Sequence, residues 1–135
     1  MTEDFDDRKA RASAWFRTLR DRIVAAFEIL EDAQTTGPFA DRPAGRFTVT
    51  ETRRDGGDGA DAGGGLMSVL RDGRVFEKVG VNVSTVYGSL GERAQAAMAA
   101  RGVPGMEADP RFWASGISLV AHMVNPHTPA VHMNT

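Results

Sequence analysis

The chain of 135 residues contains no cysteine. Disulfide bonds, thiolate nucleophiles and thiolate-ligated zinc are therefore excluded, and the composition fits a protein of the reducing cytoplasm. No apolar stretch approaches the roughly 18 residues that a membrane-spanning helix needs. The start, "MTEDFDDRKARASAW", also lacks the basic tip and apolar run of a secretory signal. We therefore expect a cytoplasmic protein without a membrane span.

The chain also lacks an excess of charge of either sign. Sixteen basic and eighteen acidic residues give a net charge of −2, which creates no global field to recruit nucleic acid or an acidic membrane. Hydrophobic residues make up 41% of the chain, as in an ordinary globular protein. We expect a single domain and no nucleic-acid partner.

Residues 5 to 34 have the apolar periodicity of a long amphipathic helix. Charged residues occupy the other side, and "TTGP" at 35 to 38 supplies a stop signal. We expect this helix to lay one apolar stripe on a sheet. The stripe consists of Trp15, Phe16, Leu19, Ile23, Phe27 and Leu30.

The next segments alternate between strand and loop signals. Residues 46 to 51, "RFTVTE", alternate as a short strand does. Residues 53 to 65, "RRDGGDGADAGGG", predict a glycine-rich loop. Such a loop is either only mobile or lets backbone N–H groups approach an anion, and the residues leave both open. A calcium site is rejected because the glycine-aspartate repeat occurs once, whereas it works in stacked copies.

Residues 66 to 87 give the strongest β signal of the chain. Asp72 and Gly73 lie between two apolar runs, which is the preferred chemistry of a tight hairpin turn. The second run places valines on one face and the polar residues Asn82 and Ser84 on the other. We expect the polar face to meet solvent or a polar ligand.

Residues 92 to 101, "ERAQAAMAAR", predict a short helix that ends before Gly102 and Pro104. Strands with helices before and between them indicate an α+β fold. We expect a mainly antiparallel β-sheet flanked by helices.

All three histidines lie in the last nineteen residues, "ISLVAHMVNPHTPAVHMNT". Two alternating runs flank "NPHTP", whose prolines exclude a regular ladder, so residues 117 to 135 predict a hairpin with His127 in its loop. A loop symmetric about His127 would place His122 opposite His132. Ser118 would then lie opposite the position after Thr135.

Two facing imidazoles have three readings. They could ligate a divalent metal, although a closed site needs three or four ligands. They could exchange protons near neutral pH. They could also be a structural pair bonded to backbone and water, and spacing alone does not decide among the three.

Two segments taken together resemble the oxygen-dependent coproporphyrinogen III oxidase family. They are "AGGGLMSVLRDGRVFEKVGVNVSTVYG" and "FWASGISLVAHMVNPHTPAVHMNT", in that order and with suitable intervals. The resemblance covers roughly residues 10 to 135 and is closest to bacterial members. It implies a large antiparallel sheet flanked by helices and a homodimer.

The resemblance also implies an activity and a set of site residues. The reaction is the oxidative decarboxylation of two propionates of coproporphyrinogen III to vinyls, which gives protoporphyrinogen IX in haem biosynthesis. Dioxygen is the co-substrate, and no organic cofactor is involved. His132 corresponds to the proposed proton donor, and Ser118, Asn134 and Thr135 correspond to substrate-binding positions. His122 and His132 correspond to ligands proposed for a divalent metal in bacterial members.

Family members are roughly twice as long as this chain, so we expect residues 1 to 135 to be the N-terminal portion of a single oxidase domain. That portion would hold the helix at about 5–34, the glycine-rich loop 53–65 and the hairpins 66–87 and 117–135. We expect it to be inactive alone. Two alternatives remain: a non-catalytic module that binds a porphyrinogen or another polycarboxylate, and a small metal-dependent β-fold enzyme that uses His122 and His132.

Overall fold

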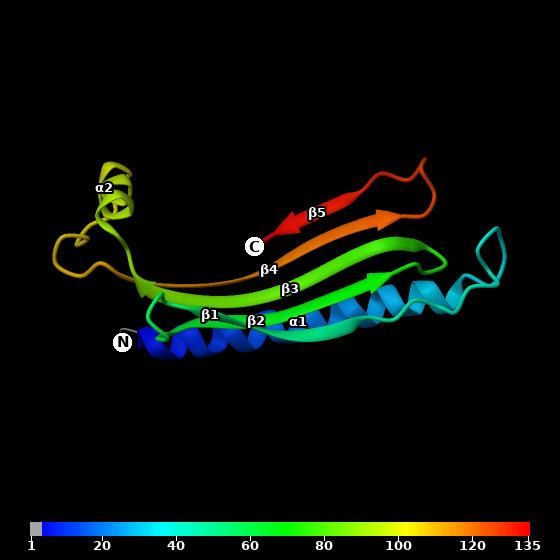
Figure 1. Cartoon of the computed structure of the whole chain (residues 1–135), viewed down its shortest axis with the longest axis horizontal. Helices are drawn as coiled ribbons and strands as arrows, with labels where there is room; N and C mark the ends of the chain where they lie inside the picture. Colours follow the sequence, from blue (N-terminus) through cyan, green and yellow to red (C-terminus); the bar gives the residue numbers. More distant parts are fainter. Residues whose placement is uncertain (1–3) are drawn as a thin grey trace.

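The computed structural model describes residues 4–135. A long helix lies along one face of a five-stranded sheet, and a short helix stands beyond one end of it (Figure 1). Every neighbouring pair of strands is antiparallel, and strand order follows chain order. The predicted α+β architecture is confirmed. The elements are α1 (Phe5–Ala33), β1 (Thr48–Asp55), β2 (Asp61–Arg71), β3 (Phe76–Ser89), α2 (Glu92–Ala100), β4 (Arg111–Met123) and β5 (Val131–Asn134).

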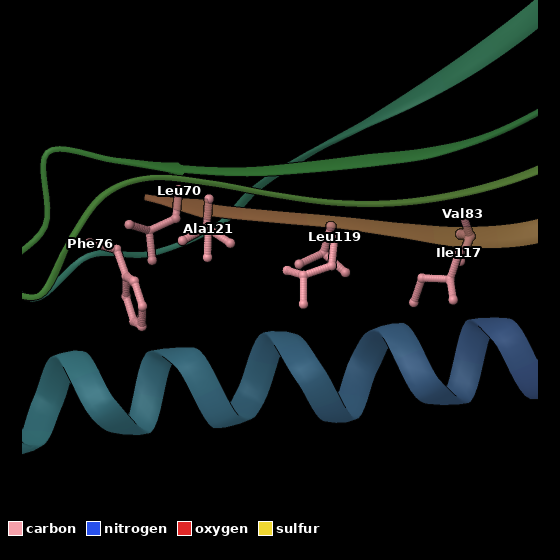
Figure 2. Packing of buried hydrophobic residues seen from close by; sticks show 8 residues of the cluster. Leu70, Phe76, Val83, Ile117, Leu119 and Ala121 are labelled. Carbon is pink, nitrogen blue, oxygen red and sulfur yellow. The ribbon is translucent and has the colours of Figure 1, made fainter. Parts of the chain in front are cut away.

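The core lies between α1 and the central strands β2, β3 and β4. Figure 2 shows the buried side chains projecting from the sheet toward the helix. Their alternation is the one that the sequence predicts for β3, with each second residue facing inward. The buried cluster consists of Leu70, Phe76, Val79, Val81, Val83, Ile117, Leu119 and Ala121.

The apolar stripe of α1 is narrower than the sequence predicts. Phe16, Leu19, Ile23 and Phe27 pack against the core. The outer members of the predicted stripe do not, because Trp15 is 49% exposed and Leu30 is 50% exposed. A helix laid on a sheet covers only one stripe, and residues at its margins stay in solvent.

The side chain of Glu31 holds the C-terminal end of α1 to the segment before β1 and to the connection between β2 and β3. Glu31 is fully buried, and its two oxygens accept backbone N–H bonds from Gly45, Arg74, Val75 and Phe76 at 2.6–2.9 Å. Burial alone would raise the pKa of this carboxyl, but the four backbone N–H bonds lower it by more, so that it lies below its usual 4.5. Glu31 is therefore buried as an anion.

The glycine-rich segment is mostly strand, so the prediction of a loop over residues 53 to 65 is wrong. Only residues 56–60 connect β1 to β2. Gly64 and Gly65 pair with β1 on one side and β3 on the other. A Cβ at Gly65 would lie 1.9 Å from the carbonyl oxygen of Val83, so a side chain has no space there. Close approach of neighbouring backbones, and not mobility, accounts for these glycines.

Other boundaries moved by a few residues. The hairpin around Asp72 forms as predicted, but residues 72–75 make a longer connection than a two-residue turn. The strand expected at 46–51 begins at Thr48 and continues to Asp55, and β4 begins at Arg111, six residues before the expected start. The short helix is confirmed as α2. Among the described residues, no helix combines the length and apolarity needed to cross a membrane.

Candidate functional site

The predicted site residues lie on β4 and β5, at one side of the sheet (Figure 1). Strand alternation divides them between two faces. Ile117, Leu119 and Ala121 are buried and face α1, so their neighbours in the strand face away from it. We name this second surface the open face. Its polar residues and one apolar residue from β3, β4 and β5 are Lys78, Asn82, Ser84, Ser118, Val120, His122, His132 and Asn134.

The register of β4 and β5 differs from the predicted one by two residues. His132 pairs with Val120, and Ser118 pairs with Asn134. The expected pairing of His122 with His132 is therefore wrong, as is the placement of Ser118 beyond the end of β5. The closing pair is Ala121 with Val131, so the paired residues are symmetric about Pro126 and not about His127.

A shift of two residues in the register of β4 and β5 leaves each side chain on the same face of the sheet. Ser118, His122, His132 and Asn134 still share the open face, because side-chain direction repeats every second residue. His122 and His132 become diagonal neighbours, which places their Cα atoms about 7–8 Å apart. Thr135 does not join them, since it pairs with Ile117 through two backbone bonds and so falls on the α1 side.

His132 has a defined partner. Its Nε2 lies 3.3 Å from Nδ2 of Asn134, two residues along β5. When the amide donates, Nε2 accepts, and the proton of the neutral ring is on Nδ1. His132 is exposed, as is the whole of β5. A substrate above the open face would therefore meet an exposed imidazole that is in contact with the Asn134 amide.

The other two histidines differ from His132. His122 is exposed and stands opposite Lys78 of β3. His127 lies in the connection between β4 and β5, where its backbone N–H donates to Oδ1 of Asn125 at 2.9 Å. The prediction that His127 belongs to the loop is confirmed.

A divalent metal does not fit the residues of this chain by themselves. His122 and His132 are diagonal, and residues 4–135 contain no cluster of three or more histidine, cysteine or acidic side chains. Two imidazoles leave a tetrahedral ion at least one protein ligand short. No step of the chemistry is therefore assigned to a metal here.

The sequence placed Asn82 on the polar face of β3, but the candidate site residues did not include it. Asn82 pairs with Ser118 on β4, which itself pairs with Asn134 on β5, so the three residues form one row across three strands. The Oδ1 atom of Asn82 is buried and has no hydrogen-bond partner among the described residues. The polar alternation of β3 pointed to this face, but no pattern in the sequence reveals that one oxygen would lack a donor.

A separate hollow lies between α1 and the glycine-rich end of β1 and β2. It encloses about 1010 Å³, and none of the predicted site residues lines it. Its arginines Arg17, Arg53 and Arg54 are matched by three carboxylates, Glu51, Asp55 and Asp61.

Two of these carboxylates are held as anions. The Tyr87 hydroxyl and the Gly63 N–H lower the pKa of Asp61, and the N–H groups of Gly57 and Gly59 lower that of Asp55. The hollow therefore has no excess of positive charge to attract a ligand with several carboxylates.

Comparisons with known proteins agree with the motifs on β2, β3, β4 and β5. The family model for coproporphyrinogen III oxidase matches residues 11–135. The oxygen-dependent coproporphyrinogen-III oxidase of Rickettsia bellii is 46% identical over 123 residues, which are 91% of this chain and 39% of that protein. The enzyme of the same name from Rickettsia felis is 45% identical over 131 residues, 96% of this chain and 42% of the relative.

The chain thus spans about two fifths of the length of the curated relatives that it matches. The match nevertheless extends over most of α1 and over the whole sheet. The chain therefore belongs to the coproporphyrinogen III oxidase family.

Proposed function

We propose that the open face forms part of the site at which coproporphyrinogen III is oxidatively decarboxylated. The observation that carries this proposal is the convergence of Ser118, His132 and Asn134 on one uncovered surface of the sheet. The family and the name of its relatives support the substrate and the use of dioxygen.

The chemistry sets what the protein must supply. Each propionate loses carbon dioxide, two electrons and a proton as it becomes a vinyl, and dioxygen takes two electrons and two protons to become hydrogen peroxide. The electron-rich tetrapyrrole is itself the reductant, so the protein's contribution is binding, orientation and proton transfer. Hydroxyl and amide donors suit a substrate with four carboxylates.

Each residue of the proposal has a role that follows from its position. Ser118 and Asn134 are directly opposed and offer two donors to one carboxylate. The same Asn134 amide contacts Nε2 of His132, which fixes the imidazole ring for proton exchange with the substrate. Thr135 contributes through its neighbours, because both of its backbone groups hold the last residues of β5 to Ile117.

We propose that His132 is required and that His127 is not. The test is a chimera in which residues 11–135 replace the matching segment of the Rickettsia felis enzyme, assayed for protoporphyrinogen formation in air. Loss of a general acid–base group lowers the rate about 10²–10⁴-fold, and we expect a loss of this size for His132→Ala. The matched control is His127→Ala, in the exposed connection. Equal activity of the two variants would overturn the assignment.

The 135-residue chain by itself is proposed to bind the tetrapyrrole without turning it over. Its site residues on β5 are all exposed, whereas catalysis of this kind excludes water from the reacting carboxylate. The purified chain should change the Soret band of coproporphyrin III but yield no product from coproporphyrinogen in air. Product formation would show that residues 1 to 135 suffice, and failure to bind would contradict a role in substrate recognition.

The remaining proposals concern assembly, location and metal. The resemblance favours a homodimer, and the composition without cysteine favours the cytoplasm. A third reading, a small enzyme that uses His122 and His132 as metal ligands, requires a stoichiometric metal that is lost on double substitution to alanine. Elemental analysis of protein purified without a histidine tag tests this reading, and the diagonal placement of the two rings predicts none.

A further inference from the structure

Asn82 carries a buried polar atom that has no partner among the residues that the structure describes. Its Oδ1 has no hydrogen-bond partner, and it is the single buried side-chain nitrogen or oxygen in this state among residues 4–135. Ser118 stands directly opposite on β4, but its hydroxyl does not bond to this oxygen. Met67, opposite on β2, has no polar hydrogen to offer.

An unpaired buried acceptor lowers the stability of a fold. Asparagine is also a poor strand former, whereas valine would suit this position in β3 on propensity. Neither packing nor strand formation therefore accounts for Asn82. A partner from outside the chain accounts for it if that partner brings an N–H or O–H donor, because the unpaired atom is an acceptor.

The position of Asn82 indicates where such a partner lies. Asn82, Ser118 and Asn134 are consecutive partners in one row, with strands about 4.8 Å apart. Asn82 is thus about 10 Å from Asn134, on the same face. The residue as a whole is part-exposed, and the terminal torsion of asparagine is soft, so a rotation of the amide brings Oδ1 to a ligand on the open face.

A tetrapyrrole offers both kinds of group at suitable places. Its carboxylates lie at the rim, and its pyrrole N–H donors point into the ring. A rim carboxylate on Ser118 and Asn134 leaves the ring extending across β4 toward β3, over Asn82. The pyrrole N–H groups are then the donors nearest to the unpaired oxygen.

We propose that Asn82 is a substrate-positioning residue whose Oδ1 accepts a pyrrole N–H while Ser118 and Asn134 hold a carboxylate of the same molecule. This inference rests on the proposed function, since it takes the substrate class from it. It adds a residue that recognises the ring itself. It also predicts that binding through Asn82, Ser118 and Asn134 depends on the distance between the pyrrole N–H groups and the carboxylate of the ligand.

The test compares two ligands and three proteins. Coproporphyrin III retains pyrrole N–H donors, whereas its nickel complex has the same carboxylates and no N–H. The proteins are the 135-residue chain, Asn82→Leu and Ser84→Ala. Ser84 is the next residue of β3 on the same face, is exposed, and has no assigned role here, so it is the matched control. Affinity is measured from the Soret band and stability from thermal unfolding.

Asn82→Leu should weaken binding of the free-base porphyrin about ten- to hundred-fold, the value of a hydrogen bond to a buried acceptor, and leave binding of the nickel complex nearly unchanged. The same variant should melt at a higher temperature than the wild type, because an unpaired acceptor is gone. Ser84→Ala should bind both ligands as the wild type does. Asn82→Val gives the same comparison if the leucine variant does not fold.

Three results would overturn the inference, and each has a different meaning. Unchanged affinity of Asn82→Leu for the free base would remove Asn82 from the site and leave the proposed function intact. An equal loss for both porphyrins would show that Asn82 acts through packing and not through an N–H bond. Absence of saturable binding by the wild type, with either ligand, would overturn the proposed function and this inference with it.

Discussion

At the scale of single residues, Glu31 joins three parts of the chain that are distant in sequence. Its carboxylate receives N–H bonds from the segment before β1 and from the connection between β2 and β3. A Cβ at Gly73 would lie 2.3 Å from one of its oxygens, so glycine at that position leaves room for the acid. The pair explains why the Asp-Gly connection is longer than a tight turn: it wraps around a buried anion.

Replacing Glu31 by glutamine should destabilise the protein by about 2–4 kcal/mol at pH 7. Glutamine keeps one acceptor oxygen and sets an NH₂ group against backbone donors that the carboxylate satisfies. Urea unfolding measures the difference. The control is Glu107→Gln, an exposed acid between α2 and β4, which should change the free energy of unfolding by less than about 0.5 kcal/mol. Equal effects of the two variants would contradict the role of Glu31.

The stabilisation by Glu31 should depend on pH. Its folded pKa is lowered, so its contribution is complete above the unfolded value of 4.5 and is lost as pH falls through the folded pKa. The difference in stability between the wild type and Glu31→Gln should therefore be constant from pH 7 to 5.5 and shrink below 4.5. Melting temperatures of both proteins across this range provide the measurement. A stability difference between the wild type and Glu31→Gln that grows as the pH falls would contradict a lowered pKa of Glu31.

The sequence predicts the positions of the candidate site residues on the sheet, but it does not predict the role of Glu31. Alternation placed Ser118, His132 and Asn134 on one strand face, and this placement survived a register that was wrong by two residues. Glu31 gave no such signal, and alternation placed Asn82 on the polar face of β3 without revealing its unpaired oxygen. The donors of Glu31 are backbone N–H groups of distant loops, and the missing donor of Asn82 is a property of the folded neighbourhood, so neither is visible in local periodicity.

At the scale of secondary-structure elements, the close approach of β1 and β3 explains why β2 contains glycines. The composition of residues 53–65 suggested a loop because glycine is a poor strand former. The structure instead uses it where the carbonyls of β1 and β3 approach, at 2.1 Å from a Cβ on Gly64 and 1.9 Å from one on Gly65. Composition alone could not distinguish a mobile loop from a crowded central strand.

Gly65→Ala should therefore destabilise the sheet by about 1–3 kcal/mol, because the methyl group displaces a central strand pairing. Gly91→Ala is the control: a Cβ there meets nothing within 4 Å, and the position precedes α2. Gly91 is the N-cap of α2, so we expect its replacement by alanine to cost less than about 1 kcal/mol. Thermal unfolding of both variants tests this, and a Gly65→Ala protein as stable as the wild type would restore the loop interpretation.

The register of β4 and β5 can be tested by cross-linking, since the chain has no cysteine of its own. Val120 and His132 are directly opposed, so Val120→Cys with His132→Cys should form a disulfide under mild oxidation. His122→Cys with His132→Cys is the matched pair for the predicted register, and its diagonal spacing is too wide for a bond without backbone movement. Preferential disulfide formation by His122→Cys with His132→Cys would instead support the predicted register, in which His122 lies opposite His132.

At the scale of the whole molecule, the long helix α1 covers one face of the five-stranded sheet, and the open face lies on the opposite side. Element type and order followed from periodicity because α1, β3 and β4 are long and strongly patterned. Strand pairing between β4 and β5 did not follow, because it depends on how the connection of residues 124–130 folds. The outer strand also leaves apolar groups in solvent, with Val131 44% and Met133 38% exposed.

Those exposed groups bear on the proposed homodimer. An edge strand with unpaired backbone groups and apolar side chains favours association with another chain. Sedimentation velocity over a hundred-fold range of concentration should show a species heavier than one 14.5 kDa chain. A single monomeric species throughout would contradict self-association of this chain.

We propose that the open face, and not the hollow beside α1, receives the tetrapyrrole. The most direct measurement is an amide NMR titration of the labelled 135-residue chain with coproporphyrin III. We predict the largest shifts at Asn82, Ser118, His132 and Asn134, which surround the row across β3, β4 and β5. Shifts concentrated at Arg17, Arg53 and Asp61 would place the ligand in the hollow and contradict the account.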